Sequence, residues 1–357
     1  MLTKTITVAE SSLKAVRIHR HGGIDQLRYE DAPEPQGAFS EEAIVKLKAA
    51  SVNHVDISTR RGLTGAEVSL PHILGGDGSG VVTEVGHLVK NVKTGDAVCL
   101  YPPIGCGRCE FCISEREFMC IQLHALGEQE NGTYAEYVRV PARNCFPIPT
   151  ALSFEEAAAF PLVYLTLWRM LVTNAKLKPG EHILIVGIGG GIGSAALQVA
   201  ARMGAHVFVT SSSDTKIARA KELGARYGIN YNKADFAKEV RQLTAKRGVD
   251  VVVDCVGGET WMQSLACLAR GGRLVTCGAT AGADPQTDIR RIFWNHLKIF
   301  GSSFGTRAEF RQVLNFMQFS RTKPVIDQIF HLRDAAMAQT RMEEGKQFGK
   351  IVLRMDG

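Results

Sequence analysis

Four cysteines lie within fifteen residues in the segment CGRCEFCISEREFMC, residues 106–120, with the spacing C-x2-C-x2-C-x7-C. Thiols gathered at such short intervals are typical of a metal site, because thiolates are preferred ligands of zinc. The spacing alone leaves two uses open. The metal could take part in a reaction, or it could only hold the chain in shape.

A second segment with chemical potential is the glycine-rich stretch LIVGIGGGIGSAALQVA, which carries Gly187, Gly190 and Gly193, with Gly189 and Gly191 between them. An apolar strand pattern precedes it and a helical pattern follows. Glycines there permit a tight turn and let backbone N–H groups approach a pyrophosphate at the helix N-terminus. A turn without a ligand and a methyl-donor site are the alternatives, and the β-α-β context favours a dinucleotide.

The end of the next strand, residues 206–210, sets the choice between the two nicotinamide cofactors. An acidic residue there would bind the ribose diol and repel a 2′-phosphate. The chain instead continues SSSDTK, so Ser211 and Ser212 can donate to a phosphate and Lys216 adds positive charge. We place Asp214 past the ribose, in the next helix, and therefore expect NADP(H) rather than NAD(H). Tyr231 either reaches the same phosphate or is an ordinary residue at a strand end.

Two kinds of element must position these groups. Residues 14 to about 150 are β-rich, with short apolar or alternating runs between Gly, Pro and Asn turns. A helix begins near Ser153, where Glu156 completes a capping box. From 181 to about 300, continuous Val/Ile/Leu runs alternate with helical patterns, which predicts a parallel sheet covered on both faces. The last fifty or so residues return to a mixed pattern, so an α/β domain is inserted into a β-rich one.

Length and composition restrict the class of protein. A chain of 357 residues favours two domains, and 45% hydrophobic with 22% charged residues is ordinary for a globular protein. The net charge of +6 is scattered, so no nucleic-acid partner is expected. The chain has no run of about 18 apolar residues, so no membrane span is expected. The N-terminus lacks the pattern of a signal peptide. Nine cysteines, an odd number, fit a reducing cytoplasm.

The chain resembles the medium-chain dehydrogenase/reductase superfamily, which contains zinc alcohol dehydrogenases and quinone oxidoreductases. The resemblance covers residues 14–357. It rests on the cysteine cluster and on SVNHVDISTRRG, LGGDGSGVVTEVG, GDAV, GTYAEYV, FPLVYLTLWRML, GIGGGIG, VVDCVGG, GGRLVTCGA and GKIVL. It implies an α/β fold in which a GroES-like β-rich catalytic domain (1–165 and 300–357) joins a Rossmann doubly wound parallel-sheet domain (166–299). The active site would lie between the domains.

The resemblance also answers the question raised by the four cysteines. They match the structural zinc lobe of the family, here residues 102–122, which implies one closed structural zinc held by Cys106, Cys109, Cys112 and Cys120. Free thiols on a loop without metal are the alternative.

The ligands of a catalytic zinc do not match. Where family members that bind this zinc carry Cys, His and often Cys, the chain has Asn53, Gly76 and Leu162. Val55 and Ser58 stand where the alcohol proton relay is expected. The amide oxygen of Asn53 and the carboxylate of Asp77, next to Gly76, are a poor set of zinc ligands on their own. We therefore expect no catalytic zinc.

The resemblance assigns further residues by position. Asn53, His54 and Asp56 are candidates for the substrate pocket, although His54 could touch the cofactor pyrophosphate and Asp56 could be structural. Tyr164 is a proton donor or core packing, and Asp77 could only brace the cleft. Lys350 meets the pyrophosphate or stabilises the last strand. The remaining positions expected along the nicotinamide and its ribose are Thr166, Ile192, Val256, Gly278, Ala279, Phe300 and Ser302.

The expected function is NADPH-dependent hydride transfer to a small molecule: an activated alkene, a quinone or a ketone. These acceptors suit a site without zinc, because the oxyanion that develops during their reduction needs only hydrogen bonds. The first alternative is a zinc-type alcohol dehydrogenase with atypical ligands. The second is a protein that binds NADPH without catalysis. Family members are usually homo-dimers or homo-tetramers, often joined at the edge of the Rossmann sheet. The strand RLVTCGA could form such an edge or lie inside the sheet.

Overall fold

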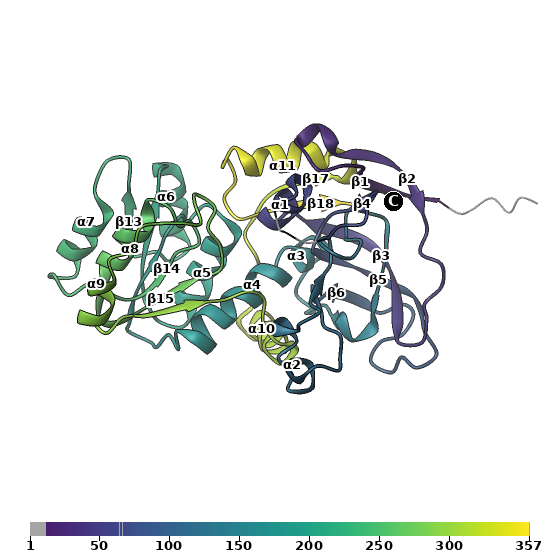
Figure 1. The fold of residues 1–357 in the computed structure, drawn as a ribbon, viewed down its shortest axis with the longest axis horizontal. Helices are drawn as coiled ribbons and strands as arrows, with labels where there is room; N and C mark the ends of the chain where they lie inside the picture. The colour runs from purple at the N-terminus through teal and green to yellow at the C-terminus, as the bar shows by residue number, and fades with distance from the viewer. Residues whose placement is uncertain (1–11, 64, 66, 357) are drawn as a thin grey trace, which may run out of the picture.

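The computed structural model describes residues 12–63, 65 and 67–356, which form two bodies side by side (Figure 1). The larger sheet of the β-rich body has the order β10-β6-β5-β3-β18-β17, with β9 also paired to β3. A three-stranded sheet has the order β2-β1-β4, and β7 pairs with β8. The strands are β1 (Ser12–Ile18), β2 (Arg28–Pro33), β3 (Glu42–Ser51), β4 (His72–Ile73), β5 (Asp77–Val85), β6 (Ala97–Leu100), β7 (Pro103–Ile104), β8 (His124–Ala125), β9 (Tyr137–Pro141), β10 (Cys145–Pro147), β17 (Ile326–His331) and β18 (Lys350–Arg354).

The C-terminal strand completes this body. β18 pairs antiparallel with β3, Val352 opposite Ser51, so residues about 300 positions apart in sequence become neighbours. Short helices cover the sheet: α1 (His54–Arg61), α3 (Phe154–Ala158) and α11 (Ala335–Glu343). The predicted capping box is confirmed, because the Ser153 hydroxyl accepts from the Glu156 N–H and the Glu156 carboxylate accepts from the Ser153 N–H.

The second body is built on a parallel six-stranded sheet of order β13-β12-β11-β14-β15-β16. This doubly wound order confirms the predicted Rossmann fold, in which ligands bind at the carboxyl ends of the strands where the order reverses. Its strands are β11 (His182–Ile185), β12 (His206–Ser211), β13 (Tyr227–Asn230), β14 (Val249–Val253), β15 (Leu268–Thr276) and β16 (Lys298–Gly301). Its helices are α5 (Gly191–Arg202), α6 (Asp214–Glu222), α7 (Phe236–Leu243), α8 (Thr260–Cys267) and α9 (Ile289–Trp294).

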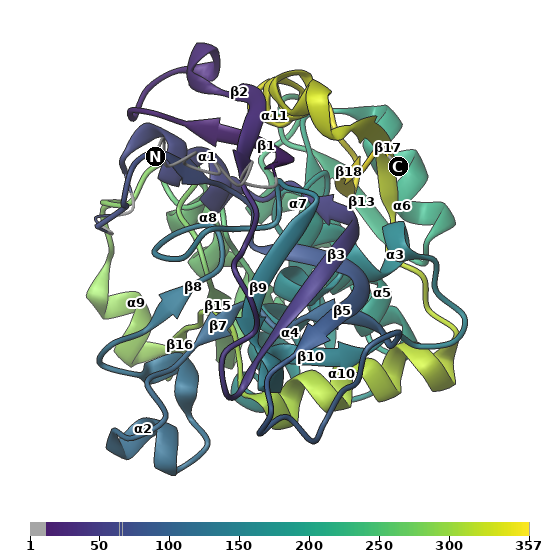
Figure 2. The same ribbon diagram turned by 90° about the vertical axis from the view of Figure 1, so that its right-hand side faces the viewer.

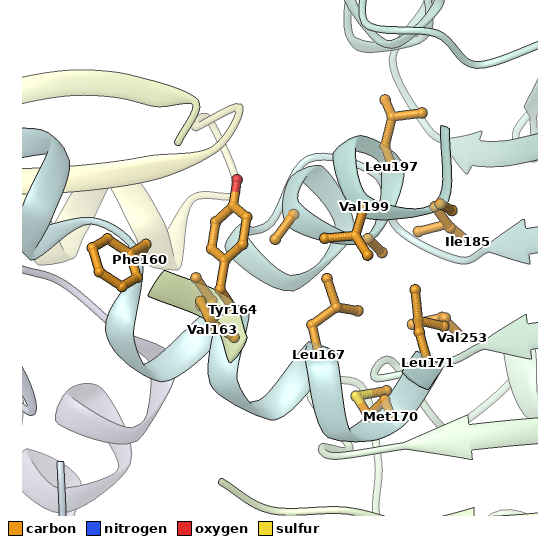
Figure 3. Packing of buried hydrophobic residues seen from close by; sticks show 14 of the residues in the cluster. Phe160, Val163, Tyr164, Leu167, Met170, Leu171, Ile185, Leu197, Val199 and Val253 are labelled. Carbon is orange, nitrogen blue, oxygen red and sulfur yellow. The ribbon is translucent and has the colours of Figure 1, made fainter. Parts of the chain in front are cut away.

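Two helices join the bodies. α4 (Pro161–Trp168) continues as a π-helical turn, η4 (Arg169–Asn174), and packs with α5 and with α10 (Arg307–Ser320). Figure 3 shows Phe160, Tyr164 and Leu167 of this segment in one apolar cluster with residues of the parallel sheet. Tyr164 is therefore core packing rather than a proton donor at the surface of the cleft, and its hydroxyl donates to Gln198.

The predicted domain boundaries fall inside elements. The boundary after residue 165 cuts α4, and the boundary at 299/300 cuts β16, whose Phe300 and Gly301 still pair with β15. RLVTCGA belongs to β15, which has β14 on one side and β16 on the other, so β16 is the edge strand. The cysteine lobe, with α2 (Glu110–Ile113) and η2 (Glu117–Met119), lies at the margin of the molecule (Figure 2). Within the described ranges, no helix combines the length and apolar character that crossing a membrane requires.

Candidate active site

A cleft of about 360 Å³ lies between the two bodies, at the carboxyl ends of β11, β14 and β15. It brings together the glycine loop and residues of α1, α4 and β18. The predicted site residues on its wall are Asn53, His54, Thr166, Gly187, Gly190, Gly191, Ile192, Gly193, Val256, Gly278 and Lys350. Of these, the glycine loop and Lys350 come from opposite bodies and meet directly, since a Cβ on Gly191 would lie 2.9 Å from Cδ of Lys350.

Two glycines of the loop have a clear steric reason. Gly187 lies two residues after β11 with φ +77°, in the left-handed region that other residues rarely adopt. A Cβ on Gly193 would lie 2.8 Å from the carbonyl oxygen of Gly187, so only glycine lets α5 pack this close to the strand. α5 begins at Gly191 and directs its N-terminus toward the cleft. This is the geometry expected of a pyrophosphate site.

A buried network of polar groups forms one wall of the cleft. The ammonium of Lys350 donates to the side-chain oxygen of Asn53 and, at 3.1 Å, to Oδ2 of Asp77. The same carboxylate oxygen accepts from Asn53 Nδ2 at 2.9 Å and from Ser51 Oγ at 3.0 Å. The other oxygen, Oδ1, accepts the backbone N–H of Leu162 at 2.8 Å. Both charges are therefore paired and hydrogen-bonded, as burial requires.

The network changes the interpretation of Asn53. Its amide was expected to donate to a substrate oxygen, but the amide nitrogen is bonded to Asp77 and the amide oxygen to Lys350. Asn53 therefore holds the network in place. The ammonium has only two acceptors among the described residues, and Lys350 is on the wall of the cleft, so its third N–H remains for a bound molecule.

The three positions at which the family resemblance places the ligands of a catalytic zinc do converge in space. Asn53 and the N–H of Leu162 both bond Asp77, and a Cβ on Gly76 would lie 3.5 Å from Cδ1 of Leu162. The oxygens available there are one amide and one carboxylate, each already bonded to an ammonium. In the described part of the chain, the cysteine cluster is the only group of three or more His, Cys, Asp or Glu close enough to share a metal.

Asp56 is not on the wall of the cleft, so its proposed catalytic role is not supported. It is the N3 residue of α1, where its carboxylate accepts the Asn53 N–H at 2.8 Å and the Tyr134 hydroxyl at 2.9 Å. This is a capping box, the structural alternative recognised in the sequence. Burial raises the pKa of Asp56 to about 7.

This burial predicts a pH-dependent stability. Folding favours the protonated form of this carboxyl. Its contribution to the free energy of unfolding is therefore fully present below about pH 4 and is lost as the pH rises through about 7. We expect Asp56→Asn, which stays neutral, to gain on the order of a few kcal/mol relative to wild type between pH 4.5 and 7.5. Urea unfolding at both pH values measures the difference. The control is Asp284→Asn, at an exposed position. If the free energy of unfolding changes equally with pH in wild type and in Asp56→Asn, the raised pKa of Asp56 is contradicted.

His54 lies at the wall of the cleft but is solvent-accessible. Desolvation by its surroundings and the nearby Lys350 charge lower its pKa, so the imidazole is neutral at pH 7. A neutral imidazole can donate one hydrogen bond to a phosphate or substrate, and adds no fixed charge.

The sequence did not reveal one carboxyl group in the cleft. Glu128 is half-buried on the wall that also holds Asn53 and His54, and burial raises its pKa. It lies in the polar loop GEQENG, whose composition is that of an ordinary turn, so no local signal distinguishes it. Other wall residues not predicted are Val52, Val55, Val163, Cys255, Cys277, Thr280, Ser303, Phe304 and Met342.

The remaining predicted cofactor residues lie outside this cleft wall. Ala279, Phe300 and Ser302 are near its rim in sequence but do not line it. Ser211 ends β12, and its carbonyl accepts the N–H of Tyr231 at 3.1 Å, so these two strand ends meet. Lys216 extends from α6 to the glycine loop, since a Cβ on Gly189 would lie 2.7 Å from its ammonium nitrogen. The ammonium donates to the carbonyl of Gly345, which follows α11, at 2.6 Å.

The acidic residue near the end of β12 is located as expected. Asp214 is the first residue of α6, after the N-cap Ser213. Its carboxylate is bonded to Asn230 at 2.8 Å and to Lys233 at 2.6 Å. Ser212, between Ser211 and this helix, is exposed.

The four cysteines of the lobe have the geometry of a zinc site. Their sulfurs all lie within 4.8 Å of one another, with Cys106 and Cys112 at 4.0 Å and Cys109 and Cys120 at 3.7 Å. Zn–S bonds of about 2.3 Å in a tetrahedron put sulfurs roughly 3.8 Å apart. Hydrogen bonding by the Cys112 N–H lowers the pKa of the Cys109 thiol to about 6, and a lower pKa favours the thiolate that binds metal. The four residues therefore fit a structural zinc, away from the cleft wall.

Comparison with known proteins agrees with this architecture. Residues 40–150 match the alcohol dehydrogenase GroES-like domain, and residues 191–318 match the zinc-binding dehydrogenase family. A zinc-type alcohol dehydrogenase-like protein of Schizosaccharomyces pombe is 33% identical over 94% of this chain and 96% of its own length. A solved NAD-dependent alcohol dehydrogenase is 40% identical over 96% of this chain and 100% of its own, with a TM-score of 0.92.

A further solved structure, crotonyl-CoA carboxylase/reductase, is 27% identical over 96% of this chain and 88% of its own, with a TM-score of 0.88. The chain thus belongs to the zinc-type alcohol dehydrogenase family of the medium-chain dehydrogenase/reductase superfamily. It is an oxidoreductase whose fold binds a nicotinamide cofactor.

Proposed function

We propose that this protein is an NADPH-dependent reductase of activated alkenes, quinones or ketones that works without a catalytic zinc. The observation that carries the proposal is the Lys350 ammonium bonded to both Asn53 and Asp77. A zinc ion using those oxygens would have to displace the ammonium or lie beside a like charge in a buried site. The fixed positive charge that a Lewis acid would supply is therefore a side chain of the protein.

In this proposal the bound nicotinamide supplies the hydride, and the residues of the chain bind and orient the acceptor. The third N–H of Lys350 faces the oxygen on which negative charge develops, and Asn53 and Asp77 hold the ammonium in place. Val52, Leu162 and Ile192 exclude water from the acceptor. An enone, quinone or activated ketone suits this site because its reduced oxygen needs only hydrogen bonds.

Glu128 is the proposed proton donor to the reduced product. Its raised pKa keeps the carboxyl protonated to a higher pH than usual, so the reductase rate should fall as the pH rises through that pKa. We expect Glu128→Gln to lower kcat about 100-fold and to remove this alkaline limb from the pH profile. The control is Glu130→Gln in the same loop, an exposed residue that is paired with His124 and does not line the cleft. An unchanged profile in Glu128→Gln would exclude this donor.

The proposed preference for NADPH rests on Ser211 at the end of β12, on Ser212 after it, on Lys216 in α6, and on the ion pair of Asp214 with Lys233. Relatives are named NAD-dependent, so this chain would differ from them. A charge-assisted bond to phosphate stabilises by about 1.5–3 kcal/mol, so Lys216→Ala should raise the KM for NADPH about 10- to 100-fold and leave that for NADH unchanged. Lys221→Ala, exposed on the same helix, is the control. Equal losses for both cofactors would refute the 2′-phosphate contact.

The acceptor class is tested by following NADPH oxidation with a panel of enones, quinones and activated ketones. Turnover that survives zinc chelation supports the proposal, and no turnover with any acceptor opposes it. The name of the crotonyl-CoA carboxylase/reductase relative favours a conjugated double bond as acceptor. The names of the alcohol dehydrogenase relatives favour the second candidate, which is alcohol oxidation with a zinc on atypical ligands. This candidate predicts that alcohols reduce NAD(P)⁺ and that chelation of zinc abolishes the reaction.

The protein is also proposed to assemble into a homo-dimer or homo-tetramer. β16 is the edge of the parallel sheet, and the adjacent α9 exposes Ile289, Phe293 and Trp294. Exposed apolar residues beside the outer edge of a sheet suit contact with a second copy. Sedimentation of the purified protein measures the assembly, and a monomer at micromolar concentration would exclude it.

A further inference from the structure

Two cysteines outside the zinc lobe lie against each other in the cleft. Cys255 follows β14 and Cys277 follows β15, and these neighbouring parallel strands pair Val253 with Val275. The two sulfurs are 3.2 Å apart, and both residues line the cleft. A disulfide requires sulfurs about 2.05 Å apart, so a shift of about 1 Å would close the bond.

The pair differs from the other cysteines in its access to solvent. All nine cysteines lie in the described part of the chain, and four belong to the zinc lobe. Of the other five, Cys99, Cys145 and Cys267 are buried, whereas Cys255 and Cys277 are partly exposed. A small oxidant that enters the empty cofactor cleft can therefore reach both members of this pair.

We propose that Cys255 and Cys277 are a reversible dithiol–disulfide pair that reacts with a small hydroperoxide and so controls cofactor binding. One thiol loses its proton, and the thiolate attacks a peroxide oxygen. The O–O bond breaks, a sulfenic acid forms, and the departing hydroxide takes up that proton and leaves as water. The second thiol attacks the sulfenic sulfur, the S–S bond forms, and the hydroxyl leaves with the thiol proton as a second water. The cysteines lose two electrons and the peroxide gains them.

The surroundings of Cys277 bear on the order of the two steps. Hydrogen bonding with Cys255 and burial raise the pKa of the Cys277 thiol well above its ordinary value. Because the thiolate is the nucleophile, this raised pKa suits Cys277 to the second step, in which the disulfide closes.

The disulfide would act on the cofactor through two short loops. The loop after Cys255 contains Val256, whose carbonyl accepts the N–H of Ala281 at 2.8 Å. Gly278 and Thr280, on the loop after Cys277, line the cleft with Val256. Drawing the sulfurs together moves both loops at the wall where the nicotinamide is expected. The inference depends on this cleft and not on the identity of the acceptor.

Peptide mapping tests the bond directly. The protein is treated with hydrogen peroxide, free thiols are alkylated, and the unreduced protein is cut with trypsin. We expect peptide 248–270 to be joined to peptide 274–290, and to be released by dithiothreitol. Because peptide 248–270 also contains Cys267, the bond should persist in Cys267→Ser and disappear in Cys277→Ser. Excess NADPH during oxidation should slow the reaction.

A binding measurement separates this pair from oxidation of the zinc lobe. NADPH affinity is compared before and after peroxide within each variant, by quenching of protein fluorescence. We expect wild type to weaken about fivefold or more and to recover with dithiothreitol, and Cys277→Ser to show no change. Two results would overturn the proposal: no cross-link at peroxide doses that already release zinc, or equal weakening in wild type and Cys277→Ser.

Discussion

Replacing Lys350 with methionine is expected to lower both activity and stability strongly. Methionine keeps the length of the side chain but leaves the buried Asp77 carboxylate without its cation. Removing one partner of a buried ion pair costs about 3–5 kcal/mol. Loss of a group that stabilises a developing oxyanion lowers kcat by on the order of 100- to 1,000-fold. Urea unfolding and steady-state NADPH oxidation measure the two effects.

A double variant separates the two roles of Lys350. Lys350→Met with Asp77→Asn removes both charges, while the asparagine oxygen can still accept the N–H of Leu162 and its amide nitrogen can donate to the Ser51 hydroxyl oxygen. The double variant should regain most of the stability that Lys350→Met loses, but its kcat should stay as low as that of Lys350→Met. Lys350→Arg keeps a cation and is expected to retain much of the stability. If kcat recovers with stability in the double variant, Lys350 is only structural.

Replacing Cys112 with serine is expected to remove the zinc and loosen the lobe. The lobe is anchored to the rest of the molecule by Glu117, whose carboxylate accepts the backbone N–H of Arg307 at 3.0 Å and the Tyr101 hydroxyl at 3.2 Å. Phe118 packs under Arg169, with the guanidinium 3.9 Å from the ring centroid. These contacts bind the lobe to η4 and to the start of α10, so its loss should spread to the joint between the bodies.

We expect Cys112→Ser to cost on the order of 5 kcal/mol and to lower Tm by about 10 °C or more. This is less than the approximately 10–16 kcal/mol of zinc in isolated zinc-finger peptides, because most of this chain has its own cores. The control is Ile113→Ser, an exposed non-ligand next to Cys112. Calorimetry measures Tm, and kcat per folded molecule should change little because no cysteine of the lobe lines the cleft. A Tm close to that of Ile113→Ser would contradict a structural metal.

The features that the sequence predicted well are those specified by neighbouring residues. The glycine loop, the capping box at Ser153 and the cysteine spacing each combine a local pattern with one steric or chemical requirement. The alternation of apolar runs with helices likewise predicted the doubly wound sheet. The convergence of Asn53, Gly76 and Leu162 could be predicted only through the family resemblance, because these positions are far apart in the chain.

What the sequence could not show depends on contacts between distant segments. Lys350 bonds Asn53 and Asp77 only because β18 returns beside β3 at the other end of the chain. Asp56 has the residue type of a catalytic group, and only its burial under Tyr134 shows that it is a cap. Glu128 and the Cys255–Cys277 pair are placed in the cleft by the packing of loops, for which the sequence has no periodic signal.

We propose that this protein holds one structural zinc and that Lys350 occupies the position of a catalytic one. Elemental analysis of protein produced with zinc in the medium tests it most directly. We expect about one zinc per chain in wild type and in Lys350→Met, and about none in Cys112→Ser. Two zinc ions per wild-type chain, or one that remains in Cys112→Ser, would contradict it.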